Sequence, residues 1–356
     1  MRHTVLLIVL VVVAALHSGC ATSGSVLLDA SSGAESGDES TTENSGETAE
    51  HSDRFEPGDI REVSIPGTPV SVTLVWVPGG SYRVGTEEAE VGRESDEGPI
   101  VDVELGGFWM MQTEVTDDAY NIFRFSDRDS DVTNVEGAAY DVDAVTRPSP
   151  PYEDPAFGMG GEGKPAVGMT QWGALQFAKW MTEKTGVFFR LPSEAEWEVA
   201  CRVGRDPESM SPASGAMLDR AAWYEENSEL LLQPVAGKRA NTWGLYDMLG
   251  NVAEWMLDEY VPDYHAQIAG RTDPWIEPTR LHPRTVRGGA YDEGAGEMRC
   301  GARLESTTDW KRRDPQIPKS YWWNTDSPFL GFRLVAPDDR PNPDDEAFFW
   351  SMVLGE

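Results

Sequence analysis

A twelve-residue stretch, Gly244-Leu-Tyr-Asp-Met-Leu-Gly-Asn-Val-Ala-Glu-Trp255, limits what this chain can fold into more than any other segment. Gly244 and Gly250 mark backbone that turns sharply or takes a positive φ, which glycine does at little cost. Asp247 and Glu254 are carboxylates among residues that favour burial, and a buried carboxylate needs a hydrogen-bonded partner or a cation. The stretch therefore predicts either a tightly cross-linked turn inside a core or a site for a hard cation.

The composition supports an irregular domain. The 356 residues include 35 Gly, 24 Pro and 13 Trp, a profile typical of a loop-rich domain held by aromatic packing rather than a helical bundle or a doubly wound sheet. With 29 basic and 61 acidic residues, the net charge is -32, which disfavours nucleic acid as a partner. Five histidines without an HxxxH or HExxH spacing disfavour a histidine-based zinc or iron site.

The N-terminal residues predict export. The apolar run from Thr4 to Leu16 is too short to span a bilayer comfortably, and small residues follow it, so residues 1–19 are interpreted as a signal peptide. Ser18-Gly-Cys-Ala21 resembles a bacterial lipobox, with Cys20 as the lipidated first residue, although His17 stands where an aliphatic residue is usual. Ordinary signal cleavage with a free Cys20 and a signal-anchor helix are the alternatives.

The predicted location is therefore the cell envelope, with a lipid anchor in the bacterial outer membrane and the domain facing the periplasm or the cell surface. Residues 20–62 are rich in Ser, Gly, Thr and Glu and predict a disordered acidic tether, because they bury too little apolar surface to offset ordering entropy.

The folded domain is predicted at residues 63–338. Alternation or short apolar runs predict strands at residues 71–77, 81–84, 105–111, 187–190, 285–287 and 331–335. Helices are predicted after the N-cap residues Thr116, Thr170 and Ser193. The C-terminal tail, residues 339–356, is acidic and then apolar, and either packs back on the domain or forms an interaction segment.

Four motifs carry a family resemblance. In order, they are Arg190-Leu-Pro-Ser-Glu-Ala-Glu-Trp-Glu-Val-Ala-Cys-Arg202, the stretch from Gly244 to Trp255, Val286-Arg-Gly-Gly-Ala290 and Gly331-Phe-Arg333. From about Leu74 to Ala336 the chain resembles the formylglycine-generating enzyme, or sulfatase-modifying factor, family. The resemblance implies a single α+β domain, an irregular, loop-rich variant of the C-type lectin fold.

The resemblance also points to missing oxidase residues. Oxidase members of the family hold copper with two cysteines shortly after an Arg-Gly-Gly-Ser motif, since Cu(I) needs thiolates. Here Ala290 replaces the Ser, Glu293 falls where the first cysteine is expected, and the segment is a few residues short at the second. Copper is therefore not expected, and no catalytic residue is assigned.

The other two cysteines match a structural pair in the family. The resemblance implies a Cys201–Cys300 disulfide, which would close a loop of about a hundred residues and add roughly 4 kcal/mol. The alternative is a catalytic or metal-binding pair, for which no third ligand is present. The second bridge of the family falls at Ala178 and Leu334, so both halves are absent together.

The opening stretch corresponds to a calcium site in the family. The implied ligands are the Asp247 and Glu254 carboxylates and the Gly250 and Val252 carbonyls, a donor set that suits Ca²⁺. The alternative is that both carboxylates accept backbone N–H bonds within the turn, with no ion.

Residues at the place of the family's active groove are Ala290, Tyr291, Asp292 and Glu293. The two acids there would suit a cation or a basic ligand. The aromatic run Tyr321-Trp-Trp323, with Trp275 and Trp310, predicts core packing or, alternatively, a binding groove. Four arginines are expected to brace the core through carboxylate pairs: Arg287, Arg299, Arg303 and Arg333.

These observations favour a non-enzymatic role. The predicted function is an exported, lipid-anchored module that binds a protein, peptide or glycan, or that serves as a structural part of the envelope. The alternative is a formylglycine-generating oxidase acting on a sulfatase cysteine. An iron-dependent sulfoxide synthase is a third possibility, but it needs a histidine-rich partner domain that this chain lacks.

Overall fold

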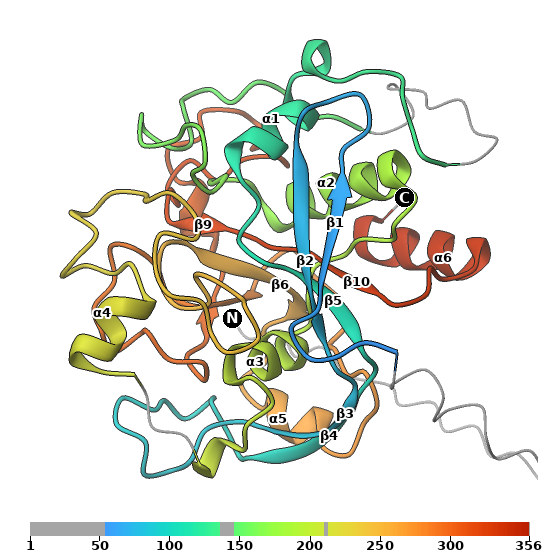
Figure 1. Cartoon of the computed structure of the whole chain (residues 1–356). Helices are drawn as coiled ribbons and strands as arrows, with labels where there is room; N and C mark the ends of the chain where they lie inside the picture. The colour runs from blue at the N-terminus through green and yellow to red at the C-terminus, as the bar shows by residue number, and fades with distance from the viewer. Residues whose placement is uncertain (1–53, 136–145, 210–212, 356) are drawn as a thin grey trace, which may run out of the picture. The chain divides into compact units, whose positions relative to one another are not determined.

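The computed structural model describes residues 54–135, 146–209 and 213–355 (Figure 1). The predicted signal peptide, Cys20 and residues 20–53 of the tether lie outside the described residues. Ordered structure begins before residue 63, because strand β1 (Ile60–Ser64) pairs with β2 (Ser71–Val77) and Phe55 packs on Trp76 with ring centroids 5.0 Å apart.

The first sheet has the strand order β1–β2–β5–β10, with antiparallel pairing throughout. The predicted strand at 71–77 is confirmed as β2, whose last four residues are buried. Strand β5 (Phe108–Met111) lies between β2 and β10 (Val335–Pro337), with Trp109 opposite Trp76. The N-terminal strands and the C-terminal end of the domain thus share one sheet.

The predicted strand at 105–111 is two strands. Residues up to Leu105 form β4 (Val101–Leu105), which pairs with β3 (Gly80–Val84) in a separate two-stranded sheet. Gly106 and Gly107 separate β4 from β5, and a Cβ on Gly107 would overlap the Trp76 ring. Because the backbone at Gly107 lies so close to the Trp76 indole, the strand is interrupted between β4 and β5.

The second larger sheet contains residues 253–255, the end of the Gly244–Trp255 stretch. Its order is β8–β7–β6–β9, and β6 (Ala253–Glu259) is buried along its whole length. Neighbouring β7 (Arg284–Arg287) is antiparallel to β6, whereas β9 (Leu330–Gly331) is parallel to it; β8 is Leu304–Glu305. The predicted strand at 331–335 is split between β9 and β10, and the one at 187–190 is reduced to a bridge between Arg190 and Val335.

The three predicted helices are confirmed with their caps. Thr116 caps α1 (Asp117–Arg124), Thr170 caps α2 (Gln171–Thr185), and Ser193 with Glu196 forms a capping box on α3 (Glu194–Arg202). The other α-helices are α4 (Leu218–Ala221), α5 (Tyr264–Ile268) and α6 (Pro343–Leu354). Short 3-10 turns are η1 (Ser126–Arg128), η3 (Pro207–Ser209), η4 (Gly215–Met217) and η5 (Thr308–Lys311).

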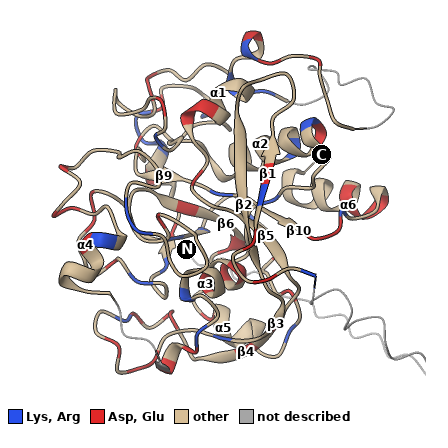
Figure 2. Ribbon diagram, viewed as in Figure 1, with Lys and Arg blue, Asp and Glu red and all other residues tan. Residues whose placement is uncertain are grey.

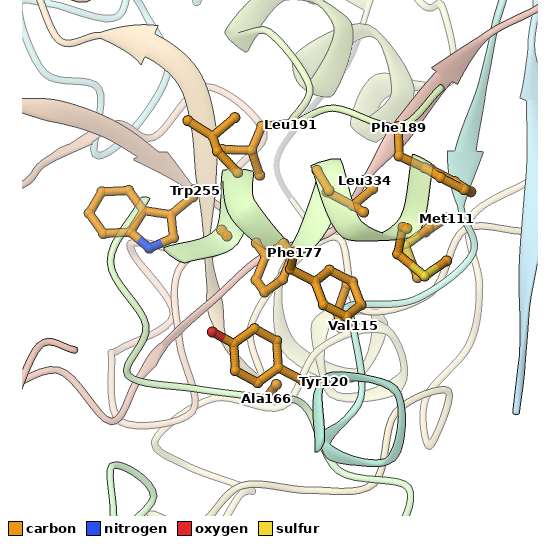
Figure 3. Close-up of a cluster of buried hydrophobic side chains, with 14 of the residues drawn as sticks. Met111, Val115, Tyr120, Ala166, Phe177, Phe189, Leu191, Trp255 and Leu334 are labelled. Carbon is orange, nitrogen blue, oxygen red and sulfur yellow. The ribbon is translucent and has the colours of Figure 1, made fainter. Parts of the chain in front are cut away.

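Helix α2 runs through the main core. Figure 3 shows Phe177 of this helix with Tyr120, Met111 and Leu334 around it, all buried. Trp322 and Trp323 also belong to this core, which confirms the packing interpretation of the aromatic run, while Tyr321 is exposed. The chain is thus an α+β domain with little regular secondary structure, as predicted.

The C-terminal tail packs back on the domain. Its residues 343–354 form α6, which lies beside α2 (Figure 1) and buries Trp350, Val353 and Leu354. The Trp350 ring is 5.6 Å from that of Phe188, between centroids. No helix among the described residues is long and apolar enough to cross a membrane.

Candidate functional site

The central turn is cross-linked on both sides. Asp247, Gly250 and Asn251 have φ angles of 51°, 77° and 55°, and a Cβ on Gly250 would overlap the Trp223 carbonyl. Gly250 N donates to Gly288 O at 2.9 Å, and Asn251 N donates to Trp223 O at 2.7 Å. The backbone of the turn is therefore held by segments on either side of it in the sequence.

Glu254 is bound by protein cations and donors. Arg333 contacts both carboxylate oxygens at 2.7 to 2.9 Å, and the Trp197 indole donates to Oε2 at 2.9 Å. The guanidinium also donates to Tyr246 O at 2.9 Å. Arg333, from the fourth motif, Gly331–Arg333, thus neutralises the glutamate of the central stretch deep in the core.

Asp247 faces a second buried carboxyl group, Glu114, that sequence reasoning did not place here. Asp247 Oδ2 accepts from Ala236 N at 2.7 Å, but Asp247 Oδ1 and both Glu114 oxygens are buried without a donor from another group. Burial and the neighbouring Asp247 charge raise the pKa of Glu114 well above its ordinary value, against the opposing effect of Arg333. A proton shared by the two carboxyls, or a cation, would satisfy these oxygens.

Asp247 and Glu254, the two carboxylates among the expected calcium ligands, have different partners. The unpaired Asp247 oxygen fits a hard cation, whereas Glu254 is already engaged by Arg333. Among the described residues, no three Asp, Glu, His or Cys side chains are grouped so that they could hold a metal ion. The expected calcium site has only two such side chains, because its other two ligands are backbone carbonyls. Glu114 supplies a further carboxyl beside this set.

A buried charge network connects the other motifs. Glu194, at the start of α3, accepts from Arg287 at 3.1 Å and from Arg303 at 2.8 and 3.0 Å. Burial acts to raise the pKa of Glu194, but Arg303 and Arg287 lower it to about 2. Arg299 is paired with Glu97 at 2.6 Å. The expectation that four arginines brace the core through carboxylates is confirmed.

Cys201 and Cys300 form a disulfide across 99 residues, with Cα atoms 5.7 Å apart. The bond links the end of α3 to the segment that follows the Arg287-Gly-Gly motif. The predicted pairing is confirmed.

The predicted groove residues lie in different environments. Ala290 and Tyr291 are buried in the core, and the Tyr291 carbonyl accepts from the Ser228 hydroxyl at 2.6 Å. Asp292 is exposed and Glu293 is half-buried. A cavity of about 30 Å³, room for a single water, touches Glu293 but none of the other three. Two acids therefore form the accessible part of this segment.

Glu293 is the most perturbed of these acids. Its Oε2 accepts from Ala290 N at 3.0 Å. Burial, followed by the nearby carboxylates of Glu297 and Asp292, raises the pKa of Glu293 to about 7. At the place where the resemblance puts an active cysteine, this chain therefore presents a carboxyl group that titrates near neutrality.

Comparison with known proteins gives consistent matches. Residues 66–317 match the family model described as sulfatase-modifying factor enzyme 1-like domain. The formylglycine-generating enzyme of Thermomonospora curvata is 27% identical over 279 residues, covering 66% of this chain and 89% of the enzyme. Serine/threonine-protein kinase Pkn1 of Chlamydia trachomatis is 27% identical over 248 residues, which cover 69% of this chain. The match spans only 37% of the length of that kinase.

Solved structures match at the level of the fold. PvdO from Pseudomonas aeruginosa superposes with a TM-score of 0.58 and 24% identity, covering 80% of this chain and 99% of PvdO. Treponema denticola variable protein 1 superposes with a TM-score of 0.54 and 22% identity, covering 78% of this chain and 99% of that protein.

Proposed function

The chain belongs to the sulfatase-modifying factor enzyme 1-like family, and from this membership we propose that it is an exported, lipid-anchored binding or structural module of the cell envelope without copper-oxidase chemistry. One observation carries the proposal. The chain has three cysteines, two of them are bonded to each other, and Glu293 stands where the resemblance places the first active cysteine. A Cu(I) site needs thiolates, and Cys20 is the one cysteine outside the disulfide.

The second candidate, a formylglycine-generating oxidase, is tested directly. The full chain is incubated with copper, oxygen and a peptide carrying the Cys-x-Pro-x-Arg motif, with the T. curvata enzyme as a positive control. We expect no aldehyde in the peptide by mass spectrometry. Conversion of the peptide cysteine to formylglycine by this chain would contradict the proposal.

The accessible acids favour a basic ligand. Burial raises the pKa values of Asp292 and Glu293, and neighbouring carboxylates raise them further: Glu225 acts on Asp292, and Glu297 and Asp292 act on Glu293. A peptide or protein segment rich in Lys and Arg suits this surface better than a neutral glycan. Fluorescence anisotropy with a labelled basic peptide should show binding that the D292N/E293Q variant weakens, while an acidic peptide of equal length does not bind. Equal binding of a neutral glycan would instead favour the glycan alternative.

We also propose structural Ca²⁺ at Asp247, Gly250, Val252 and Glu254. Support comes from the buried, unpaired oxygens of Asp247 and Glu114. Calcium at about a hundred times its Kd would stabilise the fold by roughly 2.7 kcal/mol. The expected result is a higher thermal midpoint in Ca²⁺ than in a chelator, lost in Asp247→Asn and absent with Mg²⁺. An unchanged midpoint in Ca²⁺ would favour the shared proton instead.

The lipid anchor is proposed at Cys20. Growth of a bacterial expression host with an alkyne-labelled fatty acid should label the chain, and Cys20→Ser should abolish the label. An unlabelled wild-type chain recovered in the periplasmic fraction would contradict the anchor and favour ordinary signal cleavage.

A further inference from the structure

A cavity of about 520 Å³ lies beside the end of α3, α4 and the turn at residues 247–249. None of the predicted groove residues 290–293 lines it. Five of its lining residues are arginines and two are acids: Arg202, Arg205, Arg220, Arg239, Arg299, Glu90 and Asp247. The lining thus has three more positive than negative side chains, in a chain whose net charge is -32.

Two of these arginines are committed to the fold. Arg202 donates to Glu198 at 2.9 Å and to Gly85 O at 3.0 Å. Arg299 makes a two-pronged contact with Glu97 at 2.6 and 2.7 Å, and contacts Glu90 at 3.1 Å. Both are buried, and their charges are neutralised within the structure.

The other three arginines have exposed side chains. Within the part of the chain that the structure describes, no ion pair is formed by Arg205, Arg220 or Arg239. Arg220 donates from Nε to Ala216 O at 2.8 Å, which leaves its terminal nitrogens available. Backbone contact holds two of the three together, since Arg239 N donates to Arg220 O at 2.7 Å. Figure 2 shows basic colour on α4, and basic and acidic residues on the other elements.

Acids outnumber bases about two to one in this chain, so uncompensated arginines around one cavity are an unusual arrangement. Like charges in the lining of one cavity favour the binding of an anion there. Neither acid in the lining forms an ion pair with these three arginines: Glu90 pairs with Arg299, and Asp247 accepts from Ala236 N.

Apart from Asn241, the rest of the lining is apolar. Leu245, Met248 and Met298 of the lining are buried, and Met217 is 70% exposed. The volume lies within the range of pockets that hold small organic ligands, and an apolar wall with a few charged groups is their usual composition.

We propose that this cavity binds a small organic anion, with its carboxylate, sulfate or phosphate group on Arg205, Arg220 and Arg239 and its apolar part against Met217, Met248 and Met298. Guanidinium groups match the oxygens of all three anions through paired N–H donors. The site shares no residue with the acidic segment at 292–293, so the proposal does not depend on the basic ligand proposed for that segment.

The test uses the full chain and a set of ligands that differ only in the head group. Hexanoate, hexyl sulfate and hexyl phosphate are compared with hexanol and hexylammonium by isothermal titration calorimetry at low salt. The R220Q/R239Q and R205Q variants remove the free guanidiniums, and Arg61→Gln is the matched control because Arg61 is exposed on β1 and does not line the cavity.

We expect at least one hexyl anion to bind, and R220Q/R239Q to weaken it about tenfold or more. R205Q should weaken binding to a smaller degree, and R61Q should leave it unchanged. Phosphatidylglycerol vesicles distinguish a membrane lipid from a dissolved metabolite: vesicle binding that hexyl phosphate displaces identifies a lipid head group in this same cavity, and absence of vesicle binding identifies a dissolved anion.

Three results would overturn the proposal: hexanol binding as tightly as hexanoate, no binding of any hexyl anion at millimolar concentration, or R220Q/R239Q binding like the wild type. Thermal unfolding of each variant is measured in parallel. Because these arginines form no ion pair with the described residues, their replacement should not change the unfolding midpoint, so a loss of binding reports on the cavity.

Discussion

At the residue scale, the buried glutamates depend on arginines that lie far away in the sequence. The Glu194 carboxylate accepts a hydrogen bond from the Thr285 hydroxyl at 2.6 Å and forms ion pairs with Arg287 and Arg303. Its side chain is fully buried. Removing the negative charge would leave two guanidiniums in the core with fewer partners. Such a loss is strongly destabilising because an uncompensated buried charge remains.

Glu194→Gln is therefore expected to lower the free energy of unfolding by about 3–5 kcal/mol at pH 7. The pKa of Glu194 is lowered to about 2, so the carboxylate stabilises the fold above its ordinary pKa and loses this contribution as the pH falls toward 2. The difference between wild type and variant in urea denaturation should accordingly shrink below pH 4. Glu305→Gln, at an exposed position on β8, serves as the control. A difference below about 1 kcal/mol at pH 7 would contradict the role given to the network.

Glu293 should have the opposite pH dependence. Its pKa is raised from 4.5 to about 7, so the folded state holds a proton that the unfolded state has released. The stability that this proton confers is complete below pH 4.5 and is lost as the pH rises through 7. Because Glu293 is partly solvated, Glu293→Gln is expected to be more stable than wild type by only about 1–2 kcal/mol at pH 8, and equal to it near pH 4. Parallel stability curves for the two proteins across this range would refute the assignment.

At the scale of elements, the sequence predicted the starts of α1, α2 and α3 but not the helices α4, α5 and α6. Helices α1, α2 and α3 each begin at a side-chain cap, a local signal within four residues. Strand β6 was missed because all of its residues are buried, so no alternation marks it. The run at 331–335 was predicted as one strand, but partners in two different sheets divide it.

At the candidate site, too, the sequence predicted what a local stretch determines and missed what only distant partners determine. Asp247 and Glu254 were identified from their own stretch, because carboxylates in an apolar run need partners wherever they lie. Glu114 was not placed there, since it is more than 130 positions from Asp247 and only the fold brings the two together. Arg333 was expected to pair with a carboxylate, but the choice of Glu254 follows from the parallel register of β6 and β9.

The C-terminal helix provides a test of packing. Trp350 is 5% exposed and lies against Phe188, whereas Phe348 is 67% exposed on the same helix. Trp350→Ala should cost about 3–5 kcal/mol, because a large buried side chain is removed. Phe348→Ala is the matched control and should change stability by less than about 0.5 kcal/mol. Equal effects of the two substitutions in urea denaturation would show that the packing of α6 does not depend on the buried face that carries Trp350.

At the scale of the whole molecule, one covalent bond constrains the unfolded chain. The disulfide closes a loop between residues 99 positions apart. In the chain-entropy description, a loop of this length contributes roughly 4–5 kcal/mol to stability. The C201A/C300A variant should lose about this amount in denaturant unfolding. Under reducing conditions the wild type and the variant should unfold at the same denaturant concentration; a persistent gap would show that the substitutions act through packing instead.

The disulfide also determines which fragments a protease can separate from the molecule. Helix α4 and strands β6 and β7 all lie between Cys201 and Cys300, as does the exposed pair Leu230 and Leu231. A single cut at that pair would produce two fragments that remain one molecule on a non-reducing gel and separate only after reduction. In a chain anchored at its N-terminus, as proposed, such a nick would not shed the C-terminal part into the surroundings.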